Sequence, residues 1–192
     1  MLFRKVALVA VLLASLPIPS WAAAVELKDA AGRYAITPAG SSLAFAVDSV
    51  AGKGISGKFT QYSGSIVIGG DIGRSSVRID IIPASVETGQ DRVDAFLKSN
   101  AVFDVANEHA ISFRSSSVRR TGESSATISG MLTARGRSRP ATFQAELEGM
   151  SGSSISFHVT GKVFRSPYGM DAGTPIYSNV VQFDMMLKAR RK

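Results

Sequence analysis

Hydrophobic and polar residues alternate with a period of two along much of the chain. The clearest runs cover residues 43–48, 77–82, 142–147, 155–163 and 181–188, and weaker ones cover 34–37, 65–68, 111–118 and 126–132. Successive side chains of a β-strand point to opposite faces, so each run predicts a strand with one apolar and one polar face. Glycine-rich or polar segments that predict turns separate the runs, at 69–71, 121–123, 135–137 and 149–152. Many antiparallel strands at this spacing predict an all-β sandwich or barrel.

One stretch departs from this alternation. In residues 91–99 the apolar side chains Val93, Phe96 and Leu97 recur at helical spacing. This spacing predicts a short amphipathic helix. We expect it to lie across one end of a barrel.

The first residues have the pattern of an export signal. Arg4 and Lys5 precede an apolar run at 6–16, and small residues that suit a cleavage site follow, up to Ala24. The apolar run is well short of the roughly 18 to 20 residues that a membrane-spanning helix needs, which argues against an anchor. We therefore expect a signal peptide at 1–24, cut after Ala22 or Ala24, and one exported domain at 25–192.

Charge and cysteine content narrow the function classes. The chain has 22 Lys and Arg, 15 Asp and Glu, and no Cys; loss of Arg4 and Lys5 leaves 20 basic residues and a net charge of +5. Part of this excess lies at 188–192, as a basic tail that is either solvated or in transient contact with an anionic membrane. Export argues against a nucleic-acid partner. Without cysteine, thiol nucleophiles and cysteine-based zinc sites are excluded.

The alternation alone does not say which face is inside, because a transmembrane barrel shows the same pattern with its apolar face toward lipid. Such barrels carry aromatic girdles. Here Trp21 leaves with the signal peptide, and the tyrosines are few, at 34, 62, 168 and 177. We therefore favour a barrel with a polar outer face.

Side chains that could perform catalysis are scarce. His109 and His158 are far apart and lie in no metal-binding motif, and the serine-hydrolase and phosphate-loop motifs are absent. Asp91 and Asp94 share a face of the predicted helix, where acidic residues are ordinary partners of the helix dipole. The sequence therefore predicts no catalytic residue, no metal site and no cofactor.

Large side chains gather instead on the apolar faces of the strands. They include Phe45, Phe113, Phe143, Phe157, Phe183 and Met185. These side chains either fill a solid core or line a lumen, which an eight-stranded barrel is wide enough to leave. A lumen would bind a lipid tail without any catalytic group, since ten buried methylenes contribute roughly 8 kcal/mol, equivalent to a dissociation constant near micromolar.

From Tyr34 to the C-terminus the chain resembles the YceI-like, polyisoprenoid-binding family. The similarity is carried in order by YAITPAGSSLAFAV, ISGKF followed by Gly64, SVETGQDRVDAFLKSNAVFDV, ISFRS, GMLTARGRSRPATF and FRSPYGM. Each segment is weak alone, but their order and spacing together are specific. The sequence differs from the family at Gly40, Ser49 and Phe96, where relatives commonly have histidine, and His109 replaces a usual proline.

The resemblance implies an elongated, eight-stranded, antiparallel, lipocalin-like barrel, closed at one end, with a short helix near one end. Together with the apolar faces it implies a set of lumen residues: Phe45, Val47, Phe59, Ile79, Phe96, Phe103, Phe113, Phe143, Phe157, Phe183 and Met185. Asp94, Arg135 and Arg165 are the candidate polar residues of the mouth. Arg135, Gly136 and Pro140 are expected to shape a turn, and Arg165 and Gly169 a bend or a buried polar contact.

The leading hypothesis is a periplasmic carrier or reservoir for an isoprenoid lipid of polyprenyl or quinone type. The alternative is an enzyme that acts on such a lipid through Asp91, Arg92, Asp94 and Arg165 at the barrel mouth. A third possibility is a partner of a membrane complex. The sequence does not specify the ligand's head group or the oligomeric state.

Overall fold

The computed structural model describes residues 26–192, so the signal peptide predicted at 1–24 lies outside the described residues and stays a prediction. The strands are β1 (Gly32–Ile36), β2 (Ser42–Ser49), β3 (Ile55–Phe59), β4 (Tyr62–Ile68), β5 (Ser76–Ile81), β6 (Val86–Glu87), β7 (Ile111–Arg120), β8 (Ser125–Ala134), β9 (Arg137–Ser151), β10 (Ser154–Phe164) and β11 (Tyr177–Arg191). The α-helix is α1 (Asp91–Lys98), and the 3₁₀ turns are η1 (Leu27–Ala30), η2 (Ile72–Arg74), η3 (Pro83–Ser85) and η4 (Ser166–Tyr168). Among these residues, no helix is both long and apolar enough to cross a membrane.

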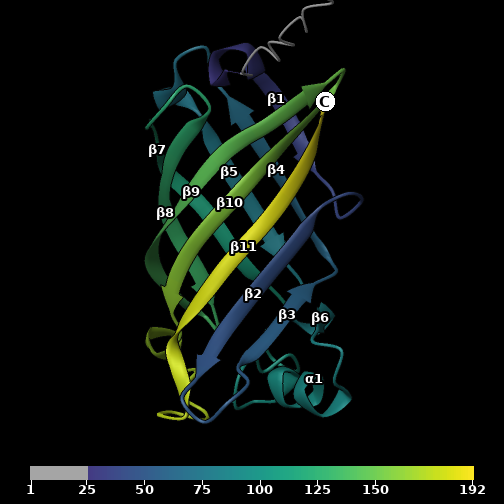
Figure 1. Ribbon diagram of the computed structural model, residues 1–192, viewed down its shortest axis with the longest axis vertical. Helices are drawn as coiled ribbons and strands as arrows, with labels where there is room; N and C mark the ends of the chain where they lie inside the picture. Colours follow the sequence, from purple (N-terminus) through teal and green to yellow (C-terminus); the bar gives the residue numbers. More distant parts are fainter. Residues whose placement is uncertain (1–25) are drawn as a thin grey trace, which may run out of the picture.

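Eight of the strands close into a ring. Their order is β1-β4-β5-β7-β8-β9-β10-β11, and β11 pairs back with β1; every pairing is antiparallel. The strands are strongly tilted around an elongated barrel (Figure 1). The predicted eight-stranded antiparallel barrel is therefore confirmed.

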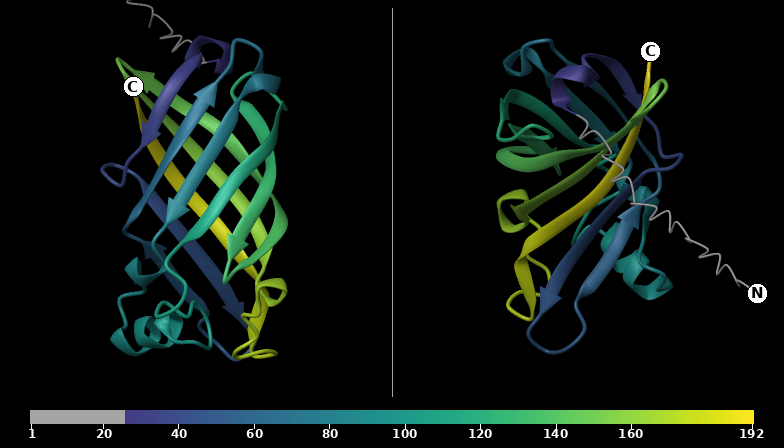
Figure 2. Two further views of the ribbon diagram at one scale, coloured as in Figure 1. Left: turned by 180° about the vertical axis from the view of Figure 1, so that it is seen from behind. Right: turned by 45° about the horizontal axis from the view of Figure 1, so that its top comes forward.

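Strand β11 is long enough to serve two partners. Its last residues, 189–191, pair with β1, whereas residues between Tyr177 and Met186 pair with β2. Strands β3 and β6 then extend the wall beyond β2. The wall on this side is therefore built from β1 toward one end of the barrel and from β2 toward the other, as both views in Figure 2 show.

One end of the barrel is filled by side chains. Turn η1 covers it, with Leu27 and Ala30 buried and the Leu27 N–H donating to the carbonyl of Glu123, 3.0 Å away. Below η1, Tyr34 is buried; its hydroxyl donates to the Ala30 carbonyl and accepts a hydrogen bond from Arg191. These contacts join the first and last strands at the closed end.

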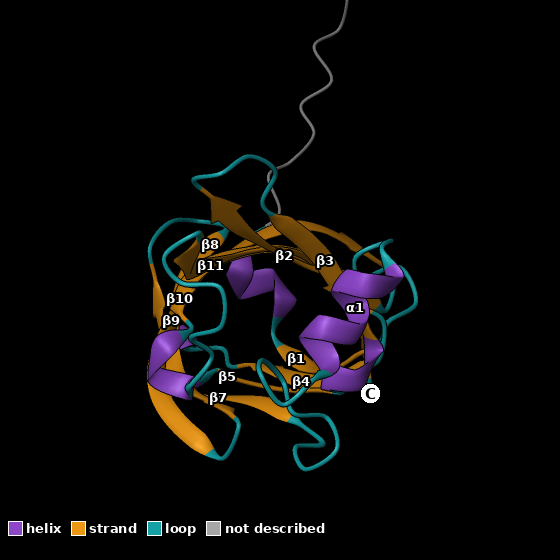
Figure 3. Ribbon diagram, turned by 90° about the horizontal axis from the view of Figure 1, so that it is seen from below, coloured by secondary structure: helices purple, strands orange, loops and turns teal. Residues whose placement is uncertain are grey.

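Helix α1 and several loops lie at the opposite end (Figures 1 and 3). The prediction of a helix there is confirmed, and Leu97 is its buried anchor. Asp94 fixes the entry of the chain into the helix, because its carboxylate accepts hydrogen bonds from both the backbone N–H and the hydroxyl of Thr88, at 2.7 and 2.5 Å. The Thr88 hydroxyl lowers the pKa of Asp94.

Strands β8 and β9 are joined by a two-residue turn, Arg135-Gly136. Both residues have positive φ, 49° and 65°, as a type I′ hairpin requires. The Arg135 guanidinium donates to the Gly169 carbonyl at 2.7 Å and thereby ties this hairpin to η4. Pro140 lies inside β9 opposite Met131 and so takes no part in the turn. It is tolerated because β9 pairs with β10 only from Phe143 onward, which leaves the other edge free at this point.

Candidate functional site

The interior of the barrel contains a cavity of about 190 Å³. Protein cores rarely hold voids larger than a water molecule, so this space is a lumen rather than a packing defect. The structure thus decides between the two interpretations of the large apolar side chains in favour of a partly empty barrel. A second, smaller cavity lies between the lumen and η1 and shares Ala145 and Phe157 with it.

All eleven residues that the sequence predicted for the lumen line this cavity. They lie at different depths. Seven are buried, namely Phe45, Phe59, Ile79, Phe113, Phe143, Phe157 and Met185. Phe96 lies at the mouth on α1, with 40% of its surface exposed. Their position along the cavity is established, and their contact with a ligand stays a prediction.

The phenylalanines leave the lumen open because three of them fold back over glycines on a neighbouring strand. A β-carbon added to Gly57 would lie 2.9 Å from the Phe45 ring, and one added to Gly130 would lie 2.8 Å from Phe113. Phe143 covers Gly161 in the same way, directly opposite it in the β9–β10 pairing. Only glycine provides this space, so these rings lie along the wall instead of across the lumen.

Contacts between the rings hold them in place. Phe45 and Phe59 have centroids 5.4 Å apart, and Phe59 lies 5.6 Å from Phe103. On another part of the wall Phe143 packs edge-on against Phe113 at 5.2 Å. These distances are typical of favourable tilted and T-shaped aromatic pairs. The cavity surface is therefore ordered as well as apolar.

Arg165 is the one charged residue that lines the cavity within residues 26–192. Its guanidinium donates to the carbonyls of Ala172 (2.9 Å), Ser178 (2.9 Å), Tyr177 (3.1 Å) and Met170, and to the hydroxyl of Thr174 (3.0 Å). Burial lowers the pKa of Arg165, and the negative charge of Asp171 partly offsets this effect. An arginine nevertheless stays protonated, so Arg165 holds the segment 170–178 in place, and its donors are used within the protein.

The other two candidate mouth residues do not line the cavity. Arg135 is bonded to Gly169 and Asp94 to Thr88, so both position backbone. The polar cluster that an enzyme at the mouth would need is not assembled from Asp94 and Arg165, whose polar atoms are committed to different segments. Among residues 26–192, no group of three or more His, Asp or Glu residues is placed to hold a metal ion.

The structure adds residues that sequence reasoning missed. Tyr168 of η4, Met170 two residues later and Tyr177, the first residue of β11, line the cavity. They lie within or at the end of the irregular connection between β10 and β11, where no alternation reveals an inward face. The three glycines beneath the phenylalanines were missed as well, because their role depends on the pairing register. His158 forms a hydrogen bond with the carboxylate of Asp184 at 2.8 Å, between β10 and β11.

Comparison with known proteins gives the family of this barrel. The model of the YceI-like domain matches residues 34–189. The chain belongs to the YceI-like family. A UPF0312 protein of Staphylococcus aureus (strain bovine RF122 / ET3-1) is 31% identical over 140 residues, covering 68% of this chain and 78% of the relative. A UPF0312 protein of Pseudomonas fluorescens (strain SBW25) is 29% identical over 119 residues, covering 59% of this chain and 62% of the relative.

Solved structures share the YceI-like fold. BcnA of Burkholderia cenocepacia superimposes with a TM-score of 0.74 at 20% identity, over 80% of this chain and 98% of that one. A polyisoprenoid binding domain from Saccharophagus degradans, implicated in plant cell wall breakdown, gives a TM-score of 0.68 at 18% identity, over 83% and 98% of the two chains. At sequence identities of 20% and 18%, the structural similarity establishes the fold.

Proposed function

We propose that this YceI-like protein binds a long isoprenoid lipid, of polyprenyl or quinone type, and carries or stores it in the periplasm. The observation that carries the proposal is the open lumen, whose wall is apolar apart from Arg165 and the tyrosines near η4. A long apolar chain gains about 0.8 kcal/mol for each methylene that it buries there. The polyisoprenoid binding domain from Saccharophagus degradans, which has the same fold, supports this ligand class.

The geometry supports binding rather than catalysis. Of the polar residues proposed to act on a lipid, only Arg165 lines the cavity, and its donors are bonded to backbone carbonyls and to Thr174. Asp94, the candidate acid or base, is bonded to Thr88 instead. We therefore propose a binding protein that releases its lipid unchanged.

The test is to identify what the protein carries. The full chain is expressed with its own N-terminus, purified from the periplasm without detergent, and examined by native mass spectrometry and by solvent extraction. We expect one lipid per chain, released by solvent and containing repeated isoprene units. Repeated recovery of empty protein that also fails to take up added polyprenol or quinone would refute the proposal. If the protein is absent from the periplasmic fraction, only the proposed location is refuted.

The glycines beneath the phenylalanines provide a prediction about affinity. In Gly161→Ala the new methyl group displaces the Phe143 ring, and we expect the ring to shift into the lumen that it lines. A ring displaced by the width of about two methylenes should weaken lipid binding about tenfold. A titration with a fluorescent isoprenoid measures the change.

The matched control is Gly149→Ala, because nothing lies within 4 Å of a β-carbon added at that glycine. It should bind the probe as the unchanged protein does. Equal affinity of the two alanine variants would show that the ring does not set the free volume.

A further inference from the structure

Of the seven large apolar side chains that are exposed to solvent within residues 26–192, four lie around the mouth of the cavity. Val50 is 86% exposed, Phe164 60%, Ile176 50% and Phe96 40%. They belong to the turn after β2, the end of β10, the segment before β11 and α1, which lie at the same end of the barrel (Figures 1 and 3). Exposed apolar groups that cluster in this way mark a contact surface.

This apolar rim is ordered and continuous with the cavity. The Val50 N–H donates to the Ile176 carbonyl at 3.0 Å, so these two side chains are neighbours on the rim. Arg165, next to Phe164, holds the segment that contains Ile176 through its bonds to Ala172 and Tyr177. Phe96 both lines the cavity and is exposed, so apolar surface runs from the rim into the lumen without a polar break.

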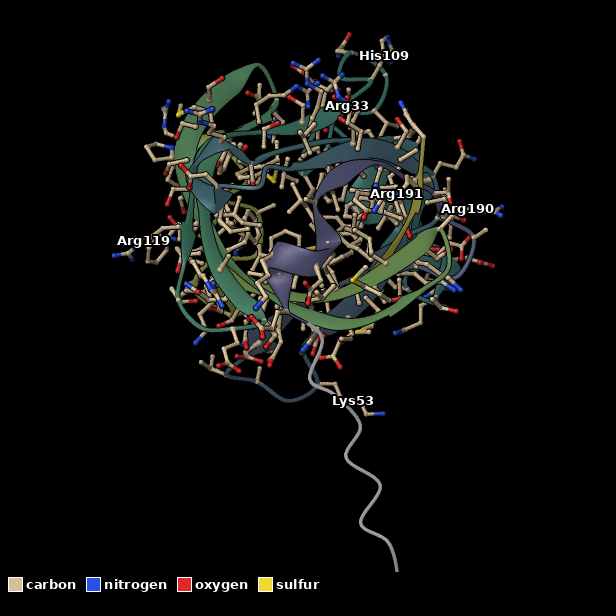
Figure 4. All side chains as sticks on the ribbon, turned by 90° about the horizontal axis from the view of Figure 1, so that it is seen from above. Arg33, Lys53, His109, Arg119, Arg190 and Arg191 are labelled. Carbon is tan, nitrogen blue, oxygen red and sulfur yellow. The ribbon has the colours of Figure 1, made fainter. Side chains whose placement is uncertain are left out.

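Charges of both signs are mixed at the mouth of the cavity. The segments 49–54, 91–109 and 171–176 carry three Lys or Arg and five Asp or Glu, and the β8–β9 hairpin, which is tied to η4, adds Arg135, Arg137 and Arg139. The closed end carries the basic C-terminal residues, and Figure 4, which looks onto that end, shows Arg33, Arg190 and Arg191 there. Because the charges at the mouth nearly balance, the mouth suits a zwitterionic or neutral apolar phase rather than an anionic one.

We propose that the rim of Val50, Phe96, Phe164 and Ile176 inserts into the surface of a lipid bilayer, so that the ligand passes between membrane and lumen without crossing water. The inference rests on the proposed function for its purpose, since a long isoprenoid resides in membranes. The binding partner of the rim is the zwitterionic or neutral lipid surface itself. Insertion is driven by apolar burial rather than by charge.

The test uses the full mature chain with a mouth variant and a wall variant. The mouth variant is Val50→Asp, Phe164→Asp and Ile176→Asp, three exposed positions outside the cavity lining. The wall variant is Met131→Asp and Met186→Asp, whose side chains are each 41% exposed on barrel strands. Circular dichroism checks that both fold. Flotation with phosphatidylcholine vesicles measures membrane binding, and a fluorescent isoprenoid alcohol, loaded either in the vesicles or from ethanol, measures transfer and binding.

We expect the mouth variant to lose membrane partitioning by roughly 30-fold or more and to take the probe from vesicles correspondingly slowly. It should bind the probe added from ethanol as the unchanged protein does, and the wall variant should match the unchanged protein throughout.

The proposal is overturned if the unchanged protein does not float with vesicles, or if the mouth variant floats and transfers equally well. Binding that requires phosphatidylglycerol and persists in the mouth variant also overturns it, because the contact would then depend on charge and not on the apolar rim. If the probe from ethanol is not bound at all, the proposed function fails, while flotation still decides the role of the rim.

Discussion

Replacement of Ala145 by phenylalanine should nearly abolish lipid binding while leaving the barrel folded. Ala145 lies on β9 between Ala126 of β8 and Val159 of β10, and its side chain lines both the main cavity and the smaller one beneath η1. A phenyl ring at this point would fill the inner part of the lumen, where the two cavities meet, and exclude about four methylenes of the ligand. At 0.8 kcal/mol each this is about 3 kcal/mol, or a loss of affinity of roughly 100-fold or more. Titration with a fluorescent isoprenoid, and the lipid content of the purified protein, measure the effect.

The matched control is Gln144→Phe, which places the same ring on the outer face of the same strand, where residue 144 is exposed. Ala145→Val should give an intermediate loss, because it adds less volume to the lumen. A folded Ala145→Phe variant that retains full lipid occupancy would mean that the ligand lies outside the lumen.

Replacement of Arg165 by methionine should lower the free energy of unfolding more than any of the other single substitutions. The guanidinium satisfies four backbone carbonyls and the Thr174 hydroxyl around a side chain that is only 8% exposed. Methionine fills similar space but leaves these acceptors without their donor, which costs about 3 kcal/mol or more. Lysine should not restore the loss, because three donors on one nitrogen cannot reach acceptors on so many sides. Denaturation with guanidinium chloride measures the free energy of unfolding.

Arg119→Ala serves as the reference for loss of an arginine, since Arg119 is exposed on β7. Its free energy of unfolding should change by less than about 0.5 kcal/mol. A similarly small change in Arg165→Met would show that water replaces the guanidinium without cost.

The sequence predicts those features of this barrel that depend on local pattern. Alternation placed Phe143, Ala145 and Leu147 on the inner face of one strand, and the structure buries all three. The helical spacing of Val93, Phe96 and Leu97 likewise predicted α1. Both features follow from the directions in which neighbouring side chains point, which the chain fixes without reference to its partners.

Other features depend on partners that are distant in sequence. Alternation gives no register, so it does not reveal that β11 pairs with both β1 and β2. For the same reason it does not show that Asp94 is held by Thr88, nor that Arg165 is surrounded by carbonyls of the segment 170–178. The sequence placed both residues near the mouth; the buried polar contact that it expected of Arg165 is present, whereas the role of Asp94 in holding the backbone at Thr88 was not foreseen.

The stacking of Phe143 over Gly161 makes the bore of the tube adjustable through one residue, because the atoms nearest to an added β-carbon there all belong to that ring, whereas at Gly57 and Gly130 backbone atoms lie as near or nearer. Substitution at a single glycine would narrow the tube from within, with the outer surface and the rim unchanged. Relatives would therefore differ in the width of the molecule they accept while keeping the same contact with a membrane, and the residue opposite Phe143 would record that difference.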